Sequence, residues 1–180
     1  MAAVVSATPS IIVPKNVIPN GAFEQYISAS QLKGWESSSS APGGQLDVIY
    51  PLNVCSPTGD CPGGSVIIRA YPPKDPNTYL SIKQSFIAKP NTQYRMNILA
   101  RCLNYDQSSG LRAFYNGVLT STAICANGNF NRVSLGFFTT NATGVGELEI
   151  RFLNGNGMDY LYYYADDVRA EAVEILPTSE

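Results

Sequence analysis

Two acidic residues near opposite ends of the chain stand beside apolar residues, where a charge is costly. Glu24 follows Phe23 in the segment "NVIPNGAFEQY", and Asp166 stands two residues before Val168 in "YYYADDVRAE". Alternation along an extended strand places Asp166 on the face of Val168, which we expect to point to the core. Two isolated buried carboxylates would each cost several kcal/mol or would take up a proton.

A divalent cation shared by Glu24 and Asp166 would remove this cost. Calcium binds carboxylates together with backbone carbonyl oxygens, and the turn "PNGAF" can supply such carbonyls. The alternative is that Glu24 is an exposed residue at a strand end and that Asp166 caps backbone N–H groups, because carboxylates at strand ends are mostly solvated or hydrogen-bonded. The residues alone leave both interpretations open.

The chain contains no histidine, and this excludes several kinds of catalytic and metal site. Ser-His-Asp and Cys-His nucleophilic catalysis need a histidine within the chain, and so do His-containing zinc sites and the His-x-Glu arrangement of deaminases. A hydrolase or lyase that acts on glycans through two carboxylates remains open, and it would need them roughly 5–10 Å apart. Glu149 is the main acidic residue expected on an outward face, so few candidates exist for such a pair.

The four cysteines suggest two disulfides and an oxidising compartment. Three pairings are possible. We expect Cys55–Cys61, which would close the loop "CSPTGDC", and Cys102–Cys125, which end two strand-like runs. A zinc site of four thiolates is the alternative, although the spacing lacks paired C-x-x-C motifs. Asn141 opens the glycosylation sequon "NAT" and adds to the expectation of a secreted protein.

Neutral polar residues, rather than charges, give this chain its polarity. Of its 180 residues, 44% are hydrophobic and 14% are charged, against roughly 25% charged in an average protein, and eleven tyrosines accompany one tryptophan. This mixture is typical of extracellular β proteins and of surfaces that bind neutral polar ligands. A net charge of −2 without a Lys/Arg cluster argues against a nucleic-acid partner, and no apolar run approaches the roughly 20 residues that span a bilayer.

Short alternating runs separated by Gly, Pro, Asn and Ser predict an all-β fold, a sandwich of two antiparallel sheets. We expect a single domain over 13–175 between tails at 1–12 and 176–180, the latter leading to further modules of a longer protein. The run "SSSSAPGGQ" at 37–45 predicts a flexible loop. The expected strands are 65–71, 79–88, 93–103, 111–119, 132–140, 146–154 and 161–173.

The faces of these strands that point away from the core carry arginine, asparagine and aromatic residues. Sugars are bound by aromatic rings that stack on C–H patches and by amides and charged groups that bond the hydroxyls. Such residues would form one polar and aromatic surface if their strands share a sheet, although cross-strand aromatic pairs also support sheets without any ligand. The expected ligand-binding residues are Arg69, Tyr71, Tyr79, Asn97, Arg112, Phe114 and Asn116.

Four motifs, in order along residues 16–172, resemble CenC-like carbohydrate-binding modules. They are "NVIPNGAFE" followed by "GW", then "LSIKQSFIAKPNTQYRMNILAR", then "FYNG" and finally "YYYADDVRAE". The resemblance implies a β-sandwich jelly roll with a sugar-binding cleft on a concave sheet. It also implies one structural calcium, whose ligands would include Glu24 and Asp166. The loop with Cys55 and Cys61 departs from the family pattern, and Trp35 stands where the family's entry tryptophan is often structural.

The sequence and the resemblance together predict a secreted, non-catalytic domain that recognises a neutral glycan such as a cell-wall polysaccharide. The missing histidine and the order of the motifs favour this function. One alternative is an extracellular surface, adhesin or effector-type interaction protein that lacks sugar binding, which the single tryptophan and the cysteine loop favour. The other is a glycan-active hydrolase or lyase.

Overall fold

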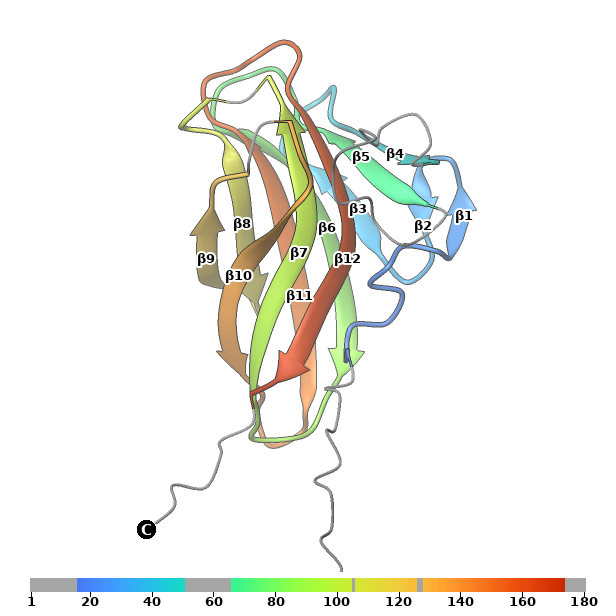
Figure 1. Cartoon of the computed structure of the whole chain (residues 1–180), viewed down its shortest axis with the longest axis vertical. Coiled ribbons are helices and arrows are strands. Elements are labelled where there is room, and N and C mark those ends of the chain that lie inside the picture. Colours follow the sequence, from blue (N-terminus) through green and yellow to red (C-terminus); the bar gives the residue numbers. More distant parts are fainter. Residues whose placement is uncertain (1–15, 51–65, 105, 126–127, 174–180) are drawn as a thin grey trace, which may run out of the picture.

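The computed structural model describes residues 16–50, 66–104, 106–125 and 128–173, and these form an all-β sandwich (Figure 1). Two five-stranded sheets face each other, and every strand pair is antiparallel. The predicted fold class is therefore confirmed. The expected tails, 1–12 and 176–180, lie outside the described residues.

Each sheet is named here after its central strand. The β12 sheet has, in spatial order, β10 (Asn131–Thr139), β7 (Gln93–Leu103), β12 (Tyr162–Ala172), β5 (Ile67–Tyr71) and β4 (Gln45–Ile49). The β11 sheet has β3 (Glu36–Ser39), β6 (Thr78–Ile87), β11 (Val145–Asn154), β8 (Gly110–Tyr115) and β9 (Val118–Ala123). A small hairpin of β1 (Tyr26–Ser28) and β2 (Gln31–Leu32) lies beside β4 (Figure 1).

Alternation along the strands fills the core between the two sheets. In β7, Met96, Ile98 and Ala100 are fully buried, and in β11 so are Leu148 and Ile150, as their spacing predicts. The intervening residues point outward and carry most of the charged groups. The core therefore fixes which side chains each sheet presents to solvent.

Two expectations about local structure are corrected. The predicted strand 111–119 is a hairpin, in which Asn116 and Gly117 join β8 to β9 with φ values of 49° and 77°. Such left-handed pairs match the twist of antiparallel strands, and Asn-Gly is their commonest sequence. The predicted flexible loop 37–45 begins as strand β3, because Ser38 pairs with Ser81 of β6 and their hydroxyls lie 2.8 Å apart.

One predicted disulfide is confirmed, between Cys102 at the end of β7 and Cys125. Cys55 and Cys61 lie outside the described residues. Asn141 is exposed in the turn between β10 and β11, where its side-chain oxygen accepts hydrogen bonds from Thr143 and Gly144. The described chain contains no helix that is long and apolar enough to cross a membrane.

Candidate functional site

The expected ligand-binding residues do not share one surface. Tyr79, Arg112 and Phe114 lie on the outer face of the β11 sheet, whereas Arg69, Tyr71 and Asn97 lie on the outer face of the β12 sheet. Asn116 sits in the β8–β9 turn, where its side-chain oxygen accepts a hydrogen bond from the Glu147 backbone N–H at 2.8 Å. The sandwich core separates the two groups, so a single ligand site can use only one of them.

On the β11 sheet an arginine joins the two candidate aromatic residues. The guanidinium of Arg151 lies 4.5 Å from the ring centre of Tyr79 and 4.1 Å from that of Phe114. Glu149 fixes it from the same strand, through bonds of 2.7 Å from Nε and 3.0 Å from Nη2. Hydrogen bonding to Glu149 raises the pKa of Arg151. The guanidinium of Arg151, which Glu149 fixes, therefore holds both rings in place, and the three side chains lie on three adjacent strands.

Cross-strand pairing arranges the neighbouring side chains in rows. Glu149 pairs with Lys83 of β6 on one side and with Phe114 of β8 on the other, and Lys83 pairs in turn with Glu36 of β3. Lys83 also forms an ion pair with Glu147 at 3.2 Å, and this contact raises its pKa. Sequence reasoning missed Glu36, Lys83 and Glu147, which only the register of β3 and β6 brings together.

The next row contains an arginine that has no polar partner in the part of the chain that the structure describes. Arg112 pairs across the strands with Arg151, and its side chain is exposed. It makes no hydrogen bond or ion pair with any of the described residues. Ser81 and Ser38 continue the row as hydroxyl groups. The outer face of the β11 sheet thus combines half-exposed rings with the exposed guanidinium of Arg112 and the exposed hydroxyl of Ser38.

On the β12 sheet the candidate groups are used within the fold. Arg69 bonds Asp47 at 2.7 Å and lies 4.9 Å from the ring centre of Tyr71, which meets Tyr162 edge to face at 4.8 Å. Asn97 accepts a hydrogen bond from Arg132 at 3.2 Å. A second apolar cluster is buried on this same face. Its members are Ile67, Leu99, Phe130 and Tyr164.

Strand alternation predicted that Asp166 and Val168 share one face of the sheet. The structure places them on opposite faces. The pairing of β12 with β7 shifts between Asp166 and Arg169, and Asp167 adopts the left-handed φ of 49°. This is the geometry of a β-bulge with an aspartate where glycine is usual. Asp166 therefore pairs with Leu99 and falls on the outer face, while Val168 reaches the core.

Asp166 is nevertheless buried, with only 1% of its surface exposed. Burial raises its pKa to about 7, and the negative charges of Asp167 and Glu24 add to the shift. Its Oδ1 accepts a hydrogen bond of 2.7 Å from the Asp167 N–H. Glu24 was expected beside the core but is exposed, and its Oε1 accepts a hydrogen bond of 3.3 Å from the Val66 N–H.

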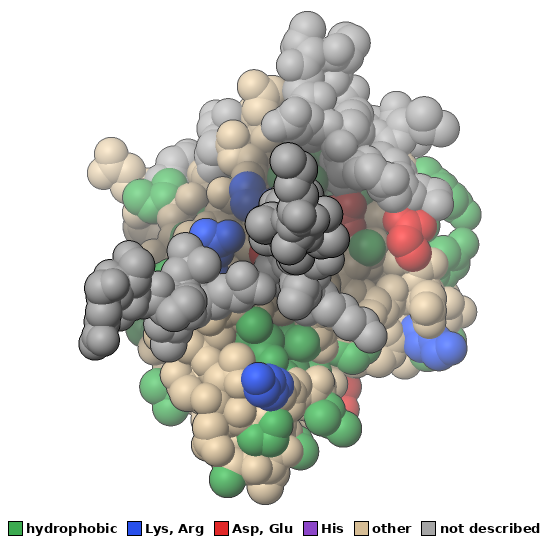
Figure 2. Space-filling view, turned by 60° about the horizontal axis from the view of Figure 1, so that its bottom comes forward, with side chains coloured by type: hydrophobic (Ala, Val, Ile, Leu, Met, Phe, Trp, Pro, Cys, Tyr) green, Lys and Arg blue, Asp and Glu red, His purple; other side chains and the backbone are tan. Residues whose placement is uncertain are grey.

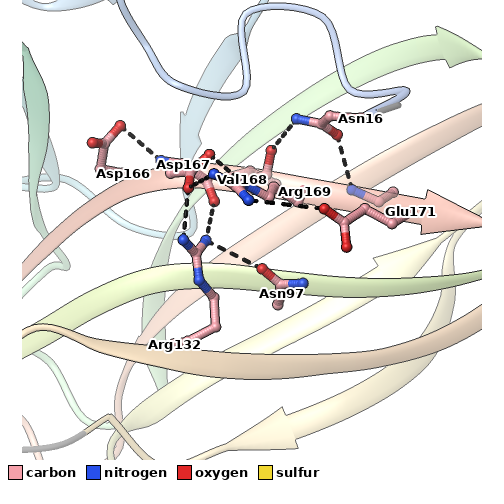
Figure 3. A network of polar contacts seen from close by, with 9 residues as sticks. Asn16, Asn97, Arg132, Asp166, Asp167, Val168, Arg169 and Glu171 are labelled. Atoms are coloured by element: carbon pink, nitrogen blue, oxygen red, sulfur yellow. Dashed lines mark hydrogen bonds and ion pairs between the residues drawn. The ribbon is translucent and has the colours of Figure 1, made fainter. Parts of the chain in front are cut away.

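The N-terminal segment replaces β5 as the neighbour of β12 where this bulge lies. β5 pairs with β12 only as far as Ala165, and the segment 16–21 bonds the next residues of β12. The Val168 N–H donates to the Gly21 carbonyl at 2.9 Å, and Asn16 bonds the backbone of Val168 and Ala170 (Figure 3). Asp166 therefore lies at the junction between these two neighbours of β12, near enough to Glu24 for its charge to raise the pKa of Asp166.

Asp167, unlike Asp166, has positively charged partners, which are two arginines on the outer face (Figure 3). Arg132 contacts its carboxylate at 2.6 Å and Arg169 at 2.7 Å. Burial alone would raise the pKa of Asp167, but the hydrogen bonds from Arg169 and Arg132 outweigh it and hold the pKa below its usual value. The two adjacent aspartates thus differ in chemistry. Asp167 is ionised and paired with arginines, whereas the pKa of Asp166 is about 7.

The described residues contain no group of three or more His, Cys, Asp or Glu side chains that could share a metal ion. A cation at Glu24 and Asp166 would therefore need carbonyl oxygens or water as further ligands. Carboxylate oxygens are ligands that suit a hard cation. The coloured side chains in Figure 2 show Lys and Arg standing singly or in pairs among neutral groups.

No protein-family model matches the chain, and no curated protein sequence matches it. Solved structures do resemble it. The family 61 carbohydrate-binding module TmCBM61, in complex with β-1,4-galactotriose, has a TM-score of 0.51 at 14% identity, over 88% of this chain and 99% of that one. The CBM22-1 xylan-binding domain of Paenibacillus barcinonensis Xyn10C has a TM-score of 0.54 at 11% identity, over 87% and 94%.

A third similar structure is an enzyme. The Stig cyclase Fisc from Fischerella sp. TAU has a TM-score of 0.63 at 15% identity and covers 89% of this chain and 98% of its own. At these identities the likeness concerns the fold. The chain therefore has a β-sandwich of the kind that carbohydrate-binding modules share, and membership of the CenC-like family stays a prediction.

Proposed function

We propose that this chain is a secreted, non-catalytic carbohydrate-binding domain that holds a neutral glycan on the outer face of the β11 sheet. The observation that carries the proposal is the cluster of Tyr79, Arg151 and Phe114, in which one guanidinium holds two half-exposed rings. Rings offer their faces to the C–H patches of sugars, and a fixed ring loses little entropy on binding.

The groups around this cluster suit sugar hydroxyls. Arg112 is exposed and has no hydrogen-bond or ion-pair partner among the described residues, and the exposed hydroxyl of Ser38 can both donate and accept. On the β12 sheet, by contrast, the carboxylate of Asp47 already occupies Arg69, and Arg132 occupies Asn97. We therefore assign the glycan to the β11 sheet and regard Arg69, Tyr71 and Asn97 as supporting the opposite sheet.

Binding without hydrolysis agrees with the state of the acidic residues on this face. Glycosidases need one protonated carboxyl and one free carboxylate on either side of the scissile bond. Glu149 uses both oxygens to hold Arg151, and Glu147 is paired with Lys83. Neither is placed to protonate a leaving group or to attack a sugar.

A structural calcium ion at Glu24 and Asp166 belongs to the same proposal. A buried carboxyl with a pKa of about 7 is half-ionised near neutral pH, and the charge of Glu24 contributes to this raised pKa. A bound divalent cation would offset the negative charges of the two carboxylates. Such an ion would tie the N-terminal segment to β12. The Cys102–Cys125 disulfide agrees with an oxidising, extracellular compartment.

Affinity electrophoresis and calorimetry against a glycan panel that includes β-1,4-galactan and xylan test the proposal. Replacing Tyr79 or Phe114 by alanine should weaken binding at least about tenfold, which corresponds to roughly 1.4 kcal/mol. Tyr71 provides a matched control, because it is also a half-buried tyrosine that stacks with an arginine, but on the opposite sheet. Tyr71→Ala should leave affinity unchanged.

Two results would contradict the assignment. If the wild-type protein bound no glycan of the panel, the domain would instead be an interaction protein on the same fold. If Tyr71→Ala abolished binding while Phe114→Ala did not, the glycan would lie on the β12 sheet.

A further inference from the structure

One motif of the sequence takes no part in the glycan face or in the proposed calcium site. It is the sequon of Asn141, Ala142 and Thr143, and all three residues are exposed in the turn that joins β10 to β11. Such a sequon directs the attachment of an oligosaccharide to asparagine in secreted proteins. Modification of Asn141 therefore depends on the secretion that the proposed function includes.

The turn that carries the sequon is held at both ends. The Gly144 N–H donates to the Asn141 carbonyl at 3.1 Å and closes a β-turn. Asparagine is favoured at the first position of such turns and glycine at the fourth, where Gly144 has φ of +71°. The neighbouring β6–β7 connection bonds the turn twice, from the Asn91 N–H to the Asn141 carbonyl at 3.2 Å and from the Ala88 N–H to the Gly144 carbonyl at 2.9 Å (Figure 1). These contacts fix the place of the sequon at one end of the sandwich.

The side chain of Asn141 is oriented through its oxygen. Its Oδ1 accepts hydrogen bonds from the Thr143 hydroxyl at 2.7 Å, the Thr143 N–H at 3.0 Å and the Gly144 N–H at 3.0 Å. Three donors around one atom assign that atom as the oxygen of the amide, so Nδ2 lies on the other side, away from these donors. Nδ2 donates no hydrogen bond to any of the described residues.

Several other asparagines of the described chain use the amide nitrogen within the fold. Nδ2 donates to a backbone carbonyl at 2.9 Å in Asn16 and at 2.6 Å in Asn104, and that of Asn20 contacts two carbonyls at 2.7 and 2.9 Å. A bulky group on any of these nitrogens would displace a contact that supports the fold. Asn141 differs, because its nitrogen can carry a substituent while its oxygen continues to hold the turn.

We propose that Asn141 is an N-glycosylation site, whose Nδ2 carries an oligosaccharide in the secreted protein. The donor belongs to the class of lipid-pyrophosphate-linked oligosaccharides. Nδ2 forms a bond to C1 of the first sugar, the bond from C1 to the pyrophosphate oxygen breaks, and Nδ2 loses one proton, so nothing is oxidised or reduced. The folded protein must then keep the attached sugars in solvent, and the exposed turn does so.

The turn lies at a distance from the proposed glycan face. Phe114 pairs with Glu149 and Tyr79 with Leu153, both further along β11 than its first residue, Val145. At roughly 3.4 Å per residue these pairs lie about 14 Å and 27 Å along the strand from Val145. Modification of the turn and recognition of a glycan are therefore separate properties, and we expect the modified protein to keep its glycan affinity.

Mass spectrometry of the full chain, secreted from a eukaryotic host behind a secretion signal, tests the site. We expect an added mass that an N-glycosidase removes, leaving aspartate in place of Asn141. Ala142→Pro is the matched variant, because proline inside the sequon prevents modification and suits the second position of such a turn. The Ala142 N–H donates no backbone hydrogen bond within the described chain. Ala142→Pro should lose the added mass completely, whereas Thr143→Ser, which keeps the hydroxyl, should retain it.

Two results would overturn the site. One is wild-type protein that is secreted with the Cys102–Cys125 disulfide formed but without a glycan on Asn141. The other is an N-linked glycan that persists in Ala142→Pro. Calorimetry against the glycan panel, before and after N-glycosidase treatment, tests the proposed function separately. Protein that is modified at Asn141 but binds no glycan in either form supports the site and overturns glycan recognition.

Discussion

The buried carboxyl of Asp166 makes the stability of the calcium-free protein depend on pH in an unusual direction. Most carboxylates in folded proteins are more acidic than in the unfolded chain and therefore stabilise the fold as pH rises. The pKa of Asp166 is instead raised, chiefly by burial, from 3.8 to about 7. The folded chain thus binds a proton more tightly than the unfolded chain. Its stabilising effect is fully present below the unfolded pKa and is lost as pH rises through the folded value.

The size of the effect follows from these two pKa values. Integration of the proton linkage between about pH 5 and pH 8 gives a loss of roughly 2.5 kcal/mol in the free energy of unfolding. For a chain of this length that corresponds to roughly 5–10 °C in melting temperature. Asp166→Asn keeps the shape of the side chain but cannot titrate, so the variant should lack this component of the pH dependence.

Urea unfolding in EDTA at both pH values gives the change in the free energy of unfolding with pH for the wild-type protein and for Asp166→Asn. The difference between these two changes measures the contribution of Asp166. Glu171→Gln is the control, because it removes a carboxylate from the same strand whose ion pair with Arg169 is long, at 3.9 Å. Calcium should stabilise the wild-type protein more at the higher pH, where Asp166 is ionised. Equal pH dependence in the wild-type protein and Asp166→Asn would refute the raised pKa, and absence of any calcium effect would refute the metal site.

Three further predictions follow from the packing and the topology. Replacing Cys102 and Cys125 together by serine should lower the free energy of unfolding by about 3 kcal/mol, measured in urea, because their disulfide closes a loop with a sequence separation of 23. Gly21→Ala should lower it by about 1–3 kcal/mol, because the new Cβ would strike the Val168 carbonyl oxygen. EDTA should change glycan affinity less than about twofold well below the melting temperature, since the proposed calcium and glycan sites lie on opposite sheets, which pack roughly 10 Å apart. A larger change in calorimetry would show that the two proposed sites are coupled.

Much of the fold could be predicted because the core uses period-two alternation. The long central strands carry strict patterns, as in β7, where Met96 and Ile98 alternate with outward polar residues. Strand β3 gave no such signal, because its "ESSS" sequence buries nothing. That strand exists through backbone pairing with β6 and the contact between Ser38 and Ser81, and neither can be seen in a local pattern. The Asn116–Gly117 dipeptide is a hairpin sequence, and the prediction of one strand over 111–119 overlooked it.

The candidate site was predictable by residue type but not by location. Tyr79, Phe114 and Tyr71 are all aromatic residues at outward positions, and their local sequences do not say which sheet each strand joins. Strand order decides this, and it puts Tyr71 on the opposite side. Lys83 and Glu36 escaped prediction for the same reason, since they become neighbours only through the pairing of β3 with β6.

A single inserted residue explains why the argument from alternation failed at Asp166, although its carboxyl is buried as expected. Without the bulge, Asp166 and Val168 would share a face, and the carboxyl would enter the apolar core. The left-handed turn at Asp167 sends Val168 inward and keeps Asp166 on the outer face. The same bend exposes the Val168 N–H to the Gly21 carbonyl, so the N-terminal segment docks where the register shifts. The left-handed backbone at Asp167 costs strain, which its ion pairs with two arginines offset. The same bulge therefore places the Asp166 carboxyl near Glu24 and lets the N-terminal segment pair with β12.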